Sequence, residues 1–167
     1  NSLCDEGIIA ALYEASAAGV EIELIVRGIC CLKVGIPGIS ENIHVRSIVG
    51  NFLEHSRIFF FLNDGEEELY MGSADWMPRN LDRRVEILFP MLDDTLKEKV
   101  KHILDVELAD NTKAHVLKPD GEYEKIDRRG KVLVNSQKQF CEEAVAAVPK
   151  TDHVYRERVF VPAEPAE

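Results

Sequence analysis

His55 and Arg57 are the first residues of this chain whose types and spacing could do chemistry. They stand two positions apart in FLEHSRIFFFL, at the start of an apolar run. In an extended chain, residues i and i+2 point to the same side, so both side chains would project into one site. A histidine can act as a nucleophile or proton shuttle, and a nearby guanidinium can bind phosphate oxygens. The pair therefore indicates phosphoryl chemistry. A purely structural alternative is a histidine at the strand end, with the arginine bonded to Glu54 or Glu41.

The segment GSADW, residues 72–76, could supply a carboxylate to that histidine. Its small residues would let another group approach the backbone closely. Asp75 could orient an imidazole, as carboxylates do in catalytic triads. The alternative is a strand end that turns through Asp75, with Trp76 filling the core.

Arginines elsewhere in the chain are further candidates for phosphate contact. Arg27 directly follows the apolar run VEIELIV and precedes Gly28. Open α/β sheets bind ligands at the carboxyl ends of such strands. The segment PRNLDRR, residues 78–84, adds Arg79, Arg83 and Arg84, and the arginine fork suits bidentate phosphate binding. A solvated loop salt-bridged to nearby acids would also account for these three residues.

The elements that must position these side chains alternate between helix and strand. Apolar spacing and caps predict helices over 5–18, 93–110 and 136–148. Strands are predicted over 20–26, 57–62, 68–74 and 83–92, with a small β-element around the Asp120-Gly121 turn. We expect RIFFFL to be buried on both faces, HVRSIVGNFLEH to carry a short helical turn, and DWMPRNLD to be loop. This order predicts an α/β fold, a mixed sheet flanked by helices.

Composition narrows the classes of partner. The net charge of −10 argues against non-specific binding to nucleic acid. No apolar run is long enough to span a bilayer. The cysteines show no CxxC spacing and the carboxylates show no ligand spacing, so we expect reduced thiols, a cytoplasmic protein and no metal site. The opening NSLCDEG, without an initiator Met, indicates a start inside a larger protein.

Two levels of resemblance follow from these motifs. The pattern HxR, strand, turn and GSxD resembles the phospholipase D superfamily signature, although that signature has lysine at the Arg57 position and asparagine at the Asp75 position. A closer resemblance is carried by IVRGICCL, PGISENIHVRSIVGNFLEHSRIFFF and GSADWMPRNLDRRVEILFP. These look like the last domain of bacterial polyphosphate kinase, of the histidine-phosphorylating type, and the similarity covers roughly the first 145 residues.

This resemblance implies a phospholipase-D-like domain over 1–147. The charged and proline-bearing end of the sequence separately predicts a partly ordered C-terminal tail over 148–167. The resemblance also implies reversible transfer of the terminal phosphate of ATP to inorganic polyphosphate, through a phosphohistidine in a domain absent here. Arg27 and His55 would contact the ATP phosphates, and His55 would be the catalytic residue of this half. Arg57, Arg79, Arg83 and Arg84 would be further phosphate or polyphosphate contacts, with Asp75 as an orienting acid. Magnesium is expected in the full enzyme, with its ligands outside this fragment.

The expected partners are therefore ATP or ADP, polyphosphate and the remaining domains of the same chain. We expect the full-length enzyme to be a homo-oligomer that binds no nucleic acid and lies in the cytoplasm or peripherally at the inner membrane face. The 167-residue chain alone is expected to be inactive, because half of the site is missing. A homodimeric phospholipase-D-like phosphodiesterase or nuclease is the alternative function, and a non-catalytic interaction domain is a third.

Overall fold

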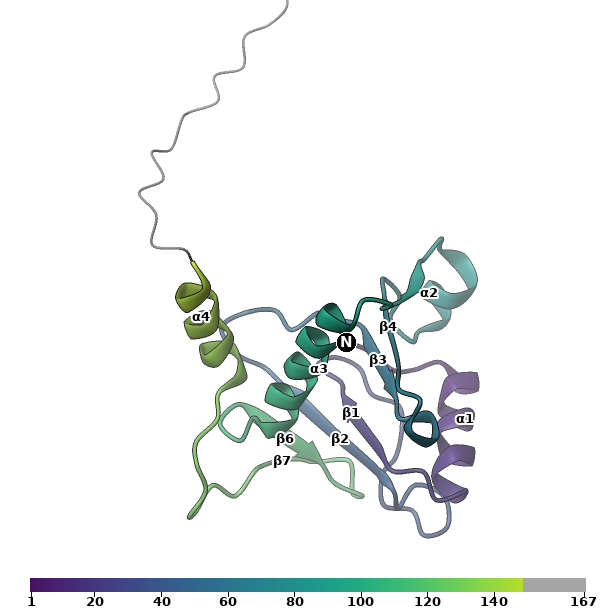
Figure 1. Ribbon diagram of the computed structural model, residues 1–167. Coiled ribbons are helices and arrows are strands. Elements are labelled where there is room, and N and C mark those ends of the chain that lie inside the picture. Colours follow the sequence, from purple (N-terminus) through teal and green to yellow (C-terminus); the bar gives the residue numbers. More distant parts are fainter. Residues whose placement is uncertain (149–167) are drawn as a thin grey trace, which may run out of the picture.

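The computed structural model describes residues 1–148, and Figure 1 shows that they form an α/β structure. Apart from Val148, the predicted tail over 148–167 lies outside the described residues. The elements run α1 (Glu6–Ala17), β1 (Ile22–Ile25), β2 (Ile43–Ile48), β3 (Ile58–Phe61), the 3-10 turn η1 (Asn63–Gly65), β4 (Glu68–Gly72), α2 (Pro78–Arg83), β5 (Leu88–Pro90), α3 (Asp94–Ala109), β6 (Ala114–Leu117), β7 (Tyr123–Lys125) and α4 (Ser136–Ala147).

The larger sheet is mixed and has the strand order β1-β2-β6-β7. β1 pairs with β2 in parallel, and the other two pairings are antiparallel. β2 corrects the sequence analysis, which predicted a helical turn in this region. The alternating burial of its side chains is typical of a strand, because Ile43 and Val45 are buried while His44 between them is exposed. Since β1 and β2 are parallel, the segments that follow them leave the sheet at the same edge.

The main core lies between this sheet and α1. Val26, Ile43 and Val45 form it together with Leu3, and Ile8 and other residues of α1 pack against them. α1 begins where predicted, because the Asp5 side chain accepts a hydrogen bond from the Ile8 amide and so caps the helix.

α3 covers the opposite face of the sheet and crosses in front of β1 and β2 in Figure 1. Arg46 fixes this arrangement by donating a hydrogen bond to the Leu108 carbonyl in the last turn of the helix. Asp110, just after α3, is fully buried and accepts backbone hydrogen bonds from Lys113 and Ser136. One carboxylate thereby joins the end of α3 to the starts of β6 and α4.

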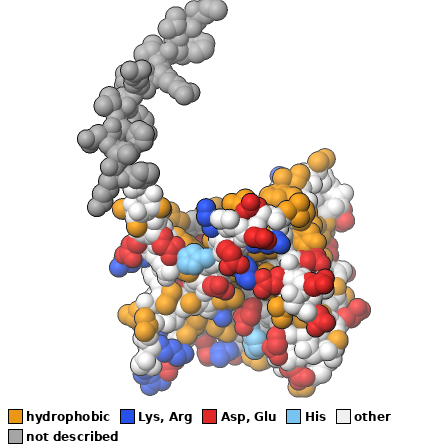
Figure 2. Space-filling view, viewed as in Figure 1, with side chains coloured by type: hydrophobic (Ala, Val, Ile, Leu, Met, Phe, Trp, Pro, Cys, Tyr) orange, Lys and Arg blue, Asp and Glu red, His pale blue; other side chains and the backbone are white. Residues whose placement is uncertain are grey.

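The second sheet is antiparallel, with the order β3-β4-β5. Its hairpin was predicted, but the burial of RIFFFL on both faces was wrong, because Phe60 and Phe61 in β3 are exposed. The segment predicted as loop forms the short helix α2, which Pro78 begins at the first helical position. Figure 2 shows hydrophobic side chains over this part of the molecule, and Leu81, Val85 and Leu88 are among its exposed residues.

Within residues 1–148, no helix is both long and apolar enough to cross a membrane.

Candidate functional site

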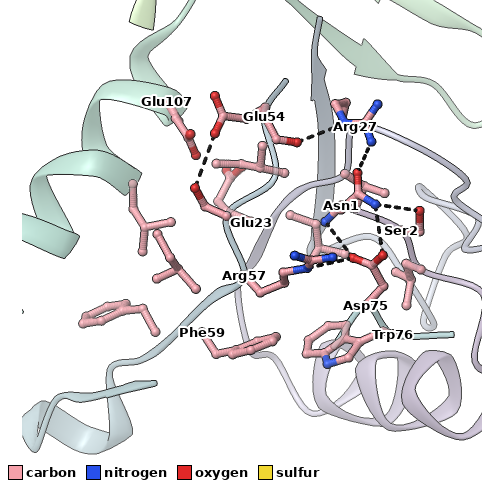
Figure 3. A pocket seen from close by; sticks show the side chains of 18 of the residues that line it. Asn1, Ser2, Glu23, Arg27, Glu54, Arg57, Phe59, Asp75, Trp76 and Glu107 are labelled. Atoms are coloured by element: carbon pink, nitrogen blue, oxygen red, sulfur yellow. Dashed lines mark hydrogen bonds and ion pairs between the residues drawn. The ribbon is translucent and has the colours of Figure 1, made fainter. Parts of the chain in front are cut away.

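A pocket of about 390 Å³ lies between α3, β1 and β3. The segment before β3, the N-terminal residues and the end of the β4 segment complete its wall. Phe59 and Trp76, which both line it, stack with ring centroids 5.1 Å apart. Figure 3 shows the polar residues Arg27, Arg57 and Asp75 converging on one side of this pocket. The motifs from distant parts of the sequence are therefore brought together here.

His55 lies on the exposed segment between β2 and β3, against Arg57. The Arg57 Nη2 atom is 2.8 Å from His55 Nε2, and Nη1 is 3.3 Å from Nδ1. A neutral imidazole has only one unprotonated nitrogen, so at most one of these contacts is a hydrogen bond and the other is close packing. The two side chains lie against each other, as their two-residue spacing predicted, but they do not both enter the pocket. Arg57 lines the pocket, while His55 stands outside its lining and is exposed to solvent.

Asp75 holds Arg57 in this position. It is 5 % exposed and accepts a hydrogen bond from Arg57 Nε at 3.1 Å and one from Asn1 Nδ2 at 3.0 Å. Burial by itself raises the pKa of Asp75, but these hydrogen bonds and the Arg57 charge outweigh it and hold the pKa below its usual range. Asp75 thus contacts Arg57, which in turn contacts His55, whereas the sequence analysis suggested a direct contact between Asp75 and the imidazole.

Arg27 has a different electrostatic setting. Its Nε donates to the Glu54 carbonyl oxygen at 3.0 Å, and its Nη2 donates to the side-chain oxygen of Asn1. Both acceptors are neutral, and within residues 1–148 no carboxylate forms an ion pair with Arg27. Arg57 is paired with Asp75, whereas Arg27 is the pocket arginine without a paired carboxylate among these residues, although Glu21, Glu23 and Glu54 also line the pocket.

The segment that carries His55 is also fastened from the other end of the chain. Gln137, in α4, donates to the Phe52 carbonyl at 2.8 Å and accepts from the Phe52 amide at 3.1 Å. Gly50 lies so close that a Cβ there would be 2.3 Å from the Gln137 side chain. The first turn of α4 thus sets the path of the chain toward His55.

Glu107 is a member of the site that the sequence analysis missed. It lies on α3, lines the pocket with Glu54, and is only 3 % exposed. Figure 3 shows its carboxyl group beside that of Glu54. Its Oε1 atom has no hydrogen-bond partner among the residues that the structure describes. Burial raises the pKa of Glu107 to about 8, with further contributions from the hydrogen bond to Glu54 and the charge of that group. At neutral pH, Glu107 therefore carries a proton.

We expect this carboxyl to make the chain less stable as the pH rises. The pKa of Glu107 is about 8 in the folded chain and 4.5 in its ordinary state, so the folded state binds the proton more tightly. Its stabilising contribution is complete below pH 4.5 and is lost as the pH rises to about 8. The free energy of unfolding should fall by on the order of 3 kcal/mol between roughly pH 5 and pH 8. Urea unfolding of the 167-residue chain at several pH values measures this.

Glu107→Gln should flatten that slope, because the amide cannot ionise. Glu98→Gln is the matched control, since Glu98 lies on the same helix with a side chain that is 75 % exposed. Its slope should equal that of the unmodified chain. An unchanged slope in Glu107→Gln would show that the buried carboxyl does not control the pH dependence.

The motif GSADW also has a structural role that the sequence analysis only partly predicted. Gly72 meets the backbone of the β5 segment closely, because a Cβ there would lie 2.9 Å from the Ile87 carbonyl oxygen. Glu86 accepts hydrogen bonds from Ser73 and from Asn80 Nδ2, the latter at 2.8 Å. Both hydrogen bonds lower the pKa of Glu86, and the one from Ser73 has the larger effect. The small residues at 72 and 73 thus allow two segments of the same domain to pack closely together.

The three arginines of PRNLDRR lie on or next to α2 and are all exposed. Arg84 pairs with Glu86 at 3.6 Å, as the structural alternative predicted. None of the three lines the pocket that contains Arg27 and Arg57. Their contact with phosphate or polyphosphate stays a prediction. Among residues 1–148 no group of three or more His, Cys, Asp or Glu side chains could hold a metal ion.

Comparison with known proteins places this arrangement in a family. Residues 1–137 match the family model "Polyphosphate kinase C-terminal domain 2". A polyphosphate kinase from Lactiplantibacillus plantarum is 54 % identical over 153 residues, which cover 92 % of this chain and 21 % of that protein. One from Pseudomonas aeruginosa is 55 % identical over 149 residues, covering 89 % and 22 %. The chain spans about a fifth of the length of the curated relatives it matches.

A solved structure agrees with these sequences. The crystal structure of polyphosphate kinase from Porphyromonas gingivalis superimposes with a TM-score of 0.83 at 43 % sequence identity. The match covers 87 % of this chain and 22 % of that one.

Proposed function

This chain belongs to the polyphosphate kinase family as its C-terminal domain 2, with the phospholipase-D-like α/β fold, and from that premise we propose that it forms one wall of a phosphate-transfer site. The complete enzyme would move the terminal phosphate of ATP reversibly onto inorganic polyphosphate. This domain would hold the nucleotide phosphates with Arg27 and His55. A phosphohistidine would lie in a domain outside this chain.

The observation that carries the proposal is the charge balance of the two pocket arginines. Arg57 is neutralised by Asp75 and is occupied in supporting His55. Arg27 donates only to neutral acceptors and has no paired carboxylate within residues 1–148, so its guanidinium would be available to a phosphate group. Hydrogen bonds between ionised partners are the strong ones, and the guanidinium can give two of them to one phosphate. Arg27 is thus built to bind an anion.

His55 would act on the same phosphate from the rim of the pocket. Its ring is exposed, and Arg57 and Asp75 fix its orientation from behind. Phosphoryl transfer needs positioning and charge neutralisation more than covalent work by the protein. An imidazole in this position can pass a proton to or from an oxygen as phosphate moves toward an opposing wall. Magnesium, expected in the complete enzyme, would be held by residues outside this chain, since no ligand group is found among residues 1–148.

The opposing wall would come from the rest of the polypeptide, since the relatives are about five times longer than the matched segment. We therefore expect no ATP-dependent polyphosphate synthesis by the purified 167-residue chain. Residues that act as a unit lose nearly all of their effect when one is removed. An assay with labelled ATP checks this, and polyphosphate made by this chain alone would overturn the two-wall proposal. Homo-oligomerisation of the full enzyme stays a prediction.

Arg27→Ala in the complete enzyme tests the phosphate contact directly. Losing hydrogen bonds to a charged ligand should raise the KM for ATP by roughly 10- to 100-fold. Arg27→Lys should recover part of this, because it keeps the charge but loses the planar fork. Arg129→Ala is the control, since Arg129 is an exposed arginine paired with Asp127. If the KM for ATP in Arg27→Ala equals that of the control, Arg27 does not bind the nucleotide.

The homodimeric phosphodiesterase or nuclease is not favoured by the family match. Hydrolysis of a generic phosphodiester by the isolated chain would revive it.

A further inference from the structure

Two cysteines that the proposed phosphate site does not use lie on neighbouring extended segments. Leu3 donates to the Ile29 carbonyl at 2.8 Å, and Cys31 donates to the Leu3 carbonyl at 2.9 Å. These bonds pair Leu3 with Cys30 in a parallel bridge. One residue further along each segment, Cys4 stands next to Cys31. All four cysteines within the described residues are free thiols.

The direction of the side chains brings these two sulphur atoms together. Leu3 is buried in the main core, and Cys30 packs against the same core. Successive side chains of extended segments point to opposite faces, so Cys4 and Cys31 both point away from that core. Paired strands lie about 4.8 Å apart, within the range of about 4.4–6.8 Å that a disulfide allows between Cα atoms.

The electrostatics agree with this placement. Desolvation raises the pKa of the Cys4 thiol, and the neighbouring Cys31 raises it further by its charge and by a side-chain hydrogen bond. Cys4 is therefore largely a protonated thiol at neutral pH. Cys31 is exposed and meets an oxidant from solvent first.

We propose that Cys4 and Cys31 are a reversible oxidation site, which hydrogen peroxide converts to an intrachain disulfide. The Cys31 thiolate attacks one peroxide oxygen, the O–O bond breaks, and the departing hydroxide takes up a proton to become water. Cys31 is then a sulfenic acid. Cys4 attacks its sulphur, the S–S bond forms, and a second water leaves. Two thiols and one hydrogen peroxide thus give one disulfide and two waters, and a dithiol reverses the change.

The disulfide would fasten a segment that touches the phosphate site. Residues 1–5 run between the 29–31 segment and Trp76, whose carbonyl accepts hydrogen bonds from the Cys4 and Asp5 amides. At the start of this segment, Asn1 contacts both Arg27 and Asp75. Oxidation would therefore restrict the motion of residues that support the site.

Peroxide treatment of the dilute 167-residue chain, followed by mass spectrometry, tests the proposal. We expect a loss of about 2 Da and, after digestion, a linked pair of peptides containing Cys4 and Cys31. The link closes a loop of roughly 30 residues, so the melting temperature should rise by roughly 5–10 °C and return on reduction. A product linked through Cys141, or a Cys30–Cys31 link, would overturn it.

Serine variants identify which two sulphur atoms form the disulfide. Cys30→Ser/Cys141→Ser leaves only Cys4 and Cys31 among the four cysteines. This variant should still form the intrachain link and show the full rise in melting temperature. Cys4→Ser and Cys31→Ser should each lose both. If the double variant folds, as its circular dichroism can show, and peroxide gives no intrachain link, the proposal is wrong.

Discussion

Replacing His55 by alanine in the complete enzyme should lower kcat for ATP-dependent polyphosphate synthesis by roughly 10²–10⁴-fold, the usual contribution of a positioned acid or base. The imidazole is exposed at the rim of the pocket, so its loss should leave the fold intact. Arg57 and Asp75 would remain paired behind it. The KM for ATP should rise much less than in Arg27→Ala, because Arg27 would still bind the phosphates. Steady-state kinetics with both substrates varied measures the two effects separately.

His115→Ala is the control for that experiment. His115 lies in β6, and its Nδ1 contacts the Lys113 carbonyl within its own strand region. Its removal should leave kcat unchanged. Full turnover by His55→Ala would show that this domain is a non-catalytic interaction module, the third hypothesis from the sequence.

Local signals predicted much of the fold. The helices α1, α3 and α4 begin directly after Asp5, Asp93 and Asn135, each of which caps its helix through its own side chain. The two hairpins were predicted from their turn residues. Each of these features depends on residues only a few positions apart, which is why the sequence alone is sufficient.

The failures occurred where distant contacts decide the structure. β2 was predicted as a helical turn, yet it lies between β1 and β6, and those neighbours make it a strand. β3 is apolar enough for a buried strand, but its sheet has only three strands and leaves Phe61 exposed. The composition of a segment shows that it is apolar, but it does not show which other elements pack against it.

The candidate site also contains features that a local sequence signal indicates and features that depend on distant contacts. The two-residue spacing of His55 and Arg57 was enough to predict that their side chains contact each other, because this contact is local, whereas their roles stay predictions. A sequence signal also existed for Glu107. It stands seven positions after Val100 on the apolar stripe of α3, where a carboxylate is unusual. No sequence signal indicated the hydrogen bond between Gln137 and Phe52, because it joins a side chain to the backbone of a residue 85 positions away.

Replacing Asp75 by alanine should cause a large loss of stability. Removing one partner of a buried ion pair leaves the other charge uncompensated, which costs about 3 kcal/mol. Arg57 would keep only its contact with His55, whose position would then be free to change. Chemical unfolding of the 167-residue chain measures the first effect, and kcat of the complete enzyme measures the second. Asp75→Asn should lose less, since the amide oxygen still accepts a hydrogen bond from Arg57.

The dependence on pH gives an independent check on Asp75. Its pKa is lowered in the folded chain, so its stabilising contribution is present above its ordinary value of 3.8 and is lost as the pH falls through the folded value. Asp75→Ala should therefore differ most from the unmodified chain near neutral pH and least in acid. Asp127→Ala is the matched control, because Asp127 pairs with Arg129 at 2.8 Å on the exposed surface. Its effect on the free energy of unfolding should be much smaller, because exposed ion pairs contribute little. Equal losses of stability in the two variants would mean that the buried Asp75–Arg57 pair stabilises the fold no more than an exposed pair does.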